Sequence, residues 1–337
     1  MPNAYDRILS GLVARGLLPP TQAAAIAEAE RRRPFSLHYE LRALLYLGIT
    51  LLSGGLGVLI YSNIDRIGHG VVIAVIAALM AACFGYAVRH RAPFNWGVAP
   101  RTSVGADYLL LLGCLLFLVL EGYVQYQYGL FGTRYGLATA LPAALFIALA
   151  YWFDHRGVLA MGLTALASWV GLNVAPLSVL GQNDFFSPVI RVAAVLLGTA
   201  LLAVGFWSEL KRRKAHFAFT YLLLGANLAL LALMATLVKA TFGSGSYWAW
   251  GPPAALLALA LCAGLFWYAR RTHSYWFLLL AAFYAYGVAC YLFGLLAIGM
   301  SGEIVIALGT LFFPASAIAI VLFFINLKKI LHSADAS

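Results

Sequence analysis

The chain has 337 residues, of which 63% are hydrophobic and only 10% are charged, and its formal net charge is +10. Soluble globular domains are about 45–50% apolar and about 25% charged. This composition therefore excludes a soluble cytosolic enzyme, a nucleic-acid-binding protein and a secreted disulfide scaffold. Apolar runs of roughly 20 residues, the length of a membrane-crossing helix, recur along the sequence. The sequence predicts an all-α polytopic membrane protein.

The first predicted domain, residues 1–38, has the pattern of a small amphipathic helical hairpin in the cytoplasm. Its first helix carries an apolar stripe that includes Leu12 and Val13 and ends at Gly16. Two prolines prevent continuation of that helix, and Thr21 is expected to be the N-cap of the second one. The hairpin is expected either to lie against the membrane surface or to dock a partner.

The second predicted domain, residues 39–327, contains the membrane spans, and residues 328–337 form a short cytoplasmic tail. Stretches free of charge define most of the spans, and one further span is predicted although it includes Asp107 and Glu121. We predict ten helices, at residues 42–62, 68–89, 105–125, 135–153, 157–174, 189–208, 216–239, 249–269, 275–296 and 303–326.

Basic residues predict the orientation of these helices. Of the 22 Lys and Arg residues, 18 fall in the tails and in alternate loops, while the other loops hold Arg66, Arg134, Arg191 and Lys239. Cytoplasmic loops of membrane proteins carry an excess of Lys and Arg, so both termini are predicted to be cytoplasmic. The basic side is expected to face anionic lipid, and a nucleic-acid partner is not expected.

A weak internal repeat marks the cytoplasmic ends of four helix pairs. GYAVRHR (85–91), AYWFDHR (150–156), VGFWSELKRR (204–213) and FWYARRTH (266–273) each combine aromatic residues with a short basic loop. The helix count fits an array of helical hairpins, and it fits equally an inverted duplication of five plus five helices. Topology alone could also produce this likeness, because interfacial aromatics and cytoplasmic bases are general features.

Two segments resemble a bacterial membrane protein family, that of domain of unknown function 2157. The first combines the hairpin LVARGLLPPTQAAAI (12–26) with GGLGVLIYSNIDRI (54–67), in which Ile64 replaces the usual tryptophan. The second joins EGYVQYQYGL (121–130) to LPAALFIALAYWFDHRGVLA (141–160). The likeness covers roughly residues 8–175. It implies a multi-pass protein of the bacterial inner membrane with undefined activity.

Glu121 is the charged residue that most needs an explanation, because a charge inside hydrocarbon costs at least about 2.5–3.5 kcal/mol. It lies inside a predicted span, with Gln125 one turn later on the same helix face. In a functional interpretation, Glu121, Asp65 and Glu303 line a cavity that opens to the outside, and Gln125 and Asn63 shape it. Such a carboxyl group could carry protons in an ion-coupled transporter.

A structural interpretation competes with the functional one. Asp65 then belongs to a solvated loop, Glu303 stabilises a helix start, and Glu121 pairs with Arg134 or reaches the interface.

Catalytic and cofactor motifs are absent from the sequence. The four cysteines all lie in predicted spans without a C-x-x-C pair, and no histidine lies in the middle of a span. We therefore expect no enzyme activity, no cofactor and no metal. The leading hypothesis is a permease-like protein that binds a small solute near Glu121, and the alternative is a membrane scaffold or sensor that acts through its N-terminal hairpin. The sequence does not indicate an oligomeric state.

Overall fold

The computed structural model describes residues 12–13, 16, 18–24, 38–97, 103–132, 134, 136–174, 187–242, 249–298 and 300–332. Within these ranges it describes the side chains except those of residues 38–40, 42, 53, 56–57, 60–67, 242 and 328–332. All regular elements in the described part of the chain are helices, so the predicted all-α fold is confirmed.

Each of the ten predicted spans corresponds to a helix. The helices are α3 (His38–Ile67), α4 (His69–Arg89), α5 (Val104–Tyr128), α6 (Leu137–Phe153), α7 (Arg156–Val174), α8 (Pro188–Leu210), α9 (Ala218–Phe242) after the short 3₁₀ helix η2 (Ala215–Phe217), α10 (Gly251–Thr272), α11 (Tyr275–Ala297) and α12 (Gly302–His332).

Among the described residues, eight helices are long and apolar enough to cross a membrane, so the protein is a multi-pass membrane protein in contact with the lipid bilayer. The two shorter apolar stretches are Ala43–Leu52, within α3, and the whole of α6, Leu137–Phe153. With 17 residues, α6 spans about 25 Å at about 1.5 Å per residue, slightly less than a typical hydrocarbon core. Crossings by α3 and α6 therefore stay predictions.

The chain divides into two compact units, residues 1–63 and residues 64–337. In the first unit, the predicted helix break at Gly16 is confirmed, because Gly16 has a left-handed backbone with φ 68° and its N–H donates to the Val13 carbonyl. The N-cap prediction for Thr21 is wrong. The next helix already begins at Pro20, since proline suits the first turn, where no N–H partner is needed. The predicted stripe residues before Leu12 lie outside the described part.

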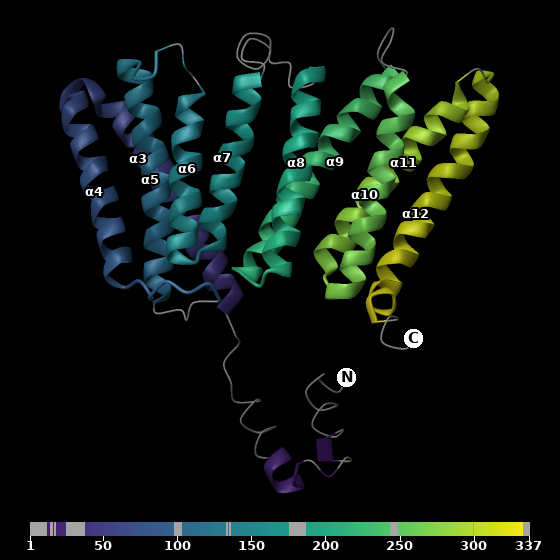
Figure 1. Cartoon of the computed structure of the whole chain (residues 1–337), viewed down its shortest axis with the longest axis horizontal. Helices are drawn as coiled ribbons and strands as arrows, with labels where there is room; N and C mark the ends of the chain where they lie inside the picture. The colour runs from purple at the N-terminus through teal and green to yellow at the C-terminus, as the bar shows by residue number, and fades with distance from the viewer. Residues whose placement is uncertain are drawn as a thin grey trace. The chain divides into compact units, whose positions relative to one another are not determined.

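In the second unit, helices adjacent in the chain pack as antiparallel hairpins. The closest pairs are α4 with α5, α6 with α7, α8 with α9, and α10 with α11, and α12 follows them. Figure 1 shows these helices side by side in chain order, from α4 at one end to α12 at the other. The hairpin-array interpretation of the repeat is therefore the one that the packing supports.

All four hairpins turn at the same end of the unit, which also holds the end of α12 (Figure 1). We call it the basic end, because its turns carry most of the unit's described Lys and Arg residues, such as Arg91, Arg156, Lys214 and Arg271. The other end is called the opposite end. The alternation of charge between loops is therefore an alternation between two ends of one structure.

Small residues allow the α8–α9 hairpin to pack most tightly. A Cβ atom added to Gly198 would lie 2.7 Å from the backbone oxygen of Gly225 and 2.7 Å from the backbone nitrogen of Ala229. Backbones this close gain van der Waals contact, which is the main force between helices in a bilayer. This hairpin contributes to both buried clusters of the unit, one over α4–α9 and the other over α8–α11.

Candidate functional site

One face of α5 places Glu121 at the end of a buried stripe, where its side chain is partly buried. The helix begins after Ser103, whose side chain accepts a hydrogen bond from the Ala106 N–H. Leu110 and Cys114 are fully buried on this face, and Phe117 packs against Phe146 of α6 with ring centroids 5.9 Å apart. Because residues three or four apart share a helix face, Glu121 continues this buried stripe by one more turn.

The side chain of Glu121 is partly buried on this face of α5. Its Oε1 atom is buried and has no hydrogen-bond partner among the described residues. The alternative pairing with Arg134 does not occur in the described part, and the Arg134 side chain is exposed. A buried polar atom without a partner costs free energy, so it calls for a functional or structural reason.

Gln125 has a structural partner. Its Oε1 accepts a hydrogen bond of 2.9 Å from the backbone N–H of Phe131, which holds the turn that follows α5. On the neighbouring helix, His69 Nδ1 lies 2.7 Å from the hydroxyl of Tyr123 and links α4 to α5 at the opposite end. Polar groups thus gather around this end of α5, and several of them already have partners.

Of the other three predicted site residues, only Glu303 has a side chain that the structure describes, so the placement of Asn63 and Asp65 in the site stays a prediction. Asn63 and Asp65 lie in the last turns of α3, and their side chains are outside the described part. Glu303 is exposed in the first turn of α12, where a carboxylate stabilises the helix N-terminus. Figure 1 shows α5 and α12 toward different ends of the row, with α5 packed on α4, α6 and α7. The candidate site is therefore Glu121 with Gln125.

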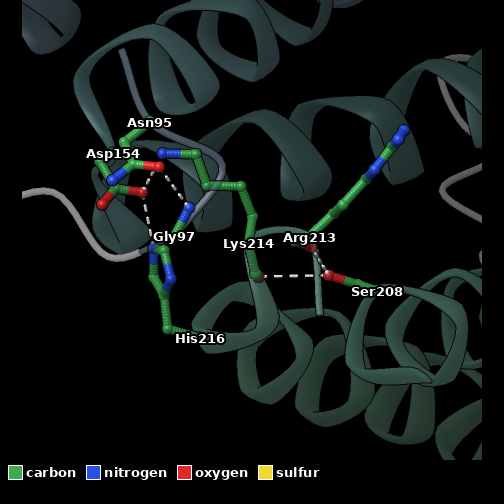
Figure 2. A network of polar contacts seen from close by, with 7 residues as sticks. All are labelled: Asn95, Gly97, Asp154, Ser208, Arg213, Lys214 and His216. Carbon is green, nitrogen blue, oxygen red and sulfur yellow. Dashed lines mark hydrogen bonds and ion pairs between the residues drawn. The ribbon is translucent and has the colours of Figure 1, made fainter. Parts of the chain in front are cut away.

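A second polar cluster, which the sequence analysis did not identify, lies at the basic end. Figure 2 shows Lys214 and His216 converging on Asp154. Lys214 Nζ lies 2.7 Å from Asp154 Oδ1, and His216 Nε2 lies 2.6 Å from the same oxygen. We call these three residues the Asp154 cluster. The Lys214 side chain is only 1% exposed, so this ion pair is buried.

Local backbone conformation explains how the cluster forms. Asp154 is the C-cap of α6 and Lys214 precedes η2, and both adopt left-handed backbones, with φ of 59° and 50°. These conformations turn the α6–α7 and α8–α9 hairpins within one or a few residues. Asp tolerates this region better than most residues do, because its short side chain can hydrogen-bond locally.

The connection between α4 and α5 adds a third segment to the cluster. The backbone N–H of Lys214 donates to the Trp96 carbonyl at 2.7 Å, and Lys214 Nζ lies 5.2 Å from the centroid of the Phe94 ring. Ser208 Oγ donates to the Arg213 carbonyl at 2.7 Å and holds the end of α8 (Figure 2). Three consecutive hairpins therefore meet at Lys214, which contacts Asp154 through its side chain and Trp96 through its backbone.

The chemistry of the Asp154 cluster suits a structural role. Its carboxylate oxygen receives both neighbouring donors, so little capacity remains for a ligand at that atom. A metal site does not form there or elsewhere in the described part, since no three His, Cys, Asp or Glu side chains gather. Lys214 and Asp154 have the pattern of ordinary loop charges in the sequence. The only local signal is that Asp154 lies in one of the repeated basic turns and Lys214 directly follows another.

The first part of the chain matches a known protein family. Residues 10–159 match the family model of predicted membrane proteins, DUF2157. The resemblance to this family is confirmed. The matched segment, less than half of the chain, includes Glu121, Gln125 and Asp154, and it ends before Lys214 and His216. No curated protein and no solved structure matches the chain.

Proposed function

We propose that the protein is a non-catalytic, permease-like membrane protein that binds a small solute at Glu121. The observation that supports this function is the buried Oε1 atom of Glu121, which has no partner among the described residues. A cationic or hydrogen-bond-donating solute, or a proton, would compensate this atom. Gln125 would then position the turn next to the bound solute. We place the protein in the bacterial inner membrane, with its basic end toward anionic cytoplasmic lipid.

Thermal unfolding of the purified full chain tests the proposal. Wild type and Glu121→Gln are screened against amines, amino acids, sugars and alkali cations at several pH values. The proposal expects at least one solute to raise the melting temperature of wild type and to lose this effect in Glu121→Gln. Glu303→Gln is the matched control, because it removes an exposed carboxylate at the same end of the helices. It is expected to respond like wild type.

Two outcomes oppose the proposal. A solute that stabilises wild type and Glu121→Gln equally would place binding elsewhere. If no solute shifts either protein, the alternative scaffold function gains support, and removal of residues 1–38 should then abolish capture of a cytoplasmic partner. A solute effect that is lost only in Glu121→Gln would instead lead directly to transport assays in vesicles.

A further inference from the structure

A lateral groove lies in the second unit, separate from Glu121. It opens between α8, α9 and α10 and has a volume of about 500 Å³. Its walls include Val192 and Leu196 of α8, Leu233 of α9 and Leu257 of α10. Val192 and Leu196 are more than half exposed, so the groove opens on a surface that faces lipid in a membrane-spanning protein. Glu121 belongs to α5, which contributes nothing to these walls.

The groove carries a single charge among its described lining residues. That charge is Arg191, in the first turn of α8, and its side chain is only 6% exposed. Thr236 and Trp250 line the groove as well. The N-terminus of a helix is itself partly positive, so Arg191 and α8 together create a site that favours an anion. A guanidinium group also matches the geometry of phosphate oxygens.

The depth of the groove matches an amphiphile that enters from the opposite end. Arg191 and Trp250 lie at the ends of their helices, at the level where headgroups meet hydrocarbon. Leu257 lies seven residues beyond Trp250, about 10 Å deeper along α10 at about 1.5 Å per residue. The charge is therefore at the headgroup level, and the apolar walls continue into the hydrocarbon.

We propose that this groove binds an anionic phospholipid, with the phosphate against Arg191 and one acyl chain along α8, α9 and α10. The apolar walls and the single buried cation fit the two parts of such a lipid. This inference does not depend on the function proposed for Glu121, and Glu121→Gln is expected to retain the lipid.

Native mass spectrometry of the purified full chain, after exchange into detergent with added lipid, tests this site. Phosphatidylglycerol is compared with phosphatidylcholine of identical chains and with free oleate. Wild type is expected to retain one phosphatidylglycerol in preference to the other two. Arg191→Gln should weaken phosphatidylglycerol retention about tenfold, as expected for the loss of one charge-assisted phosphate contact, and Arg191→Lys should restore part of it.

Two bulky substitutions on α8 separate groove binding from general lipid contact. Val192→Trp fills the groove, whereas Val189→Trp adds the same ring outside the lining residues; the two valines are 60% and 58% exposed. Val192→Trp should lose the bound lipid, and Val189→Trp should retain it. Equal retention by both variants, or by wild type and Arg191→Gln, would overturn the proposal. Preferential retention of oleate would also overturn it, because the occupant would then lack a phosphate.

Discussion

Two carboxylates at opposite ends of the helix row differ in whether they are paired. At the basic end, Asp154 accepts from Lys214 and His216 at 2.7 and 2.6 Å. At the opposite end, Glu121 Oε1 is buried without any partner in the described part. A paired carboxylate holds neighbouring segments together, whereas an unpaired one lowers stability and leaves its binding capacity for a ligand. The contrast predicts a structural role for the Asp154 cluster, and it is the basis of the binding proposed at Glu121.

The largest effect is expected from breaking the buried ion pair. Asp154→Asn removes the charge and keeps a residue that tolerates the left-handed backbone. Because it leaves the buried ammonium of Lys214 uncompensated, it should lower the free energy of unfolding by about 3–5 kcal/mol. Unfolding in mixed micelles, followed by tryptophan fluorescence, measures the loss.

A double variant serves as the control for this prediction. Asp154→Asn combined with Lys214→Met removes both charges and should recover part of the lost stability. If Asp154→Asn alone unfolds like wild type, the Asp154 cluster does not hold the hairpins together.

A smaller effect is expected from the second donor of the cluster. His216→Phe retains an aromatic ring beside Phe217, whose centroid is 4.5 Å from that of His216, and deletes the contact between Nε2 and Asp154. The loss should be only about 1–2 kcal/mol, because the variant also removes the buried Nδ1 atom, which has no partner among the described residues, and this offsets part of the cost. His216→Gln, which keeps an N–H donor, should lose less. A larger loss in His216→Gln than in His216→Phe would mean that ring packing and not the hydrogen bond matters.

The smallest expected effect has the opposite sign. Glu121→Gln breaks no ion pair among the described residues and removes a charge that is costly to bury, so it should raise the free energy of unfolding by about 1 kcal/mol at pH 8. Glu303→Gln should change stability by less than about 0.5 kcal/mol. Destabilisation of Glu121→Gln would show that the carboxylate has a partner after all.

Hydropathy predicted the helix positions closely because few backbone conformations are stable inside a bilayer. Polar backbone groups must bond within the segment, so an apolar run of sufficient length becomes a helix. The predicted span 105–125 lies within α5, Val104–Tyr128, and the predicted span 275–296 agrees with α11 to one residue. The predicted span 249–269 starts slightly early, because prolines 252 and 253 belong to the first turn of α10, Gly251–Thr272.

The candidate site was predictable only in part. Glu121 could be singled out because a carboxylate inside an apolar helix is costly in any packing arrangement. Its separation from Glu303 could not be predicted, since nothing in either segment specifies which helices are neighbours. The groove at Arg191 could not be predicted either, because its lining residues come from three helices whose sequences are ordinary apolar ones.

The sequence by itself determined the membrane class, the helix positions and the alternation of charge between loops, because these depend on hydrophobicity and charge along the chain. Tertiary structure decided which charges are buried. In the turn KRRK, Lys211 is exposed, while Lys214 is only 1% exposed and pairs with Asp154, which is 60 residues away in the chain. Two identical side chains in one turn acquire different roles because only one of them faces a carboxylate from another hairpin.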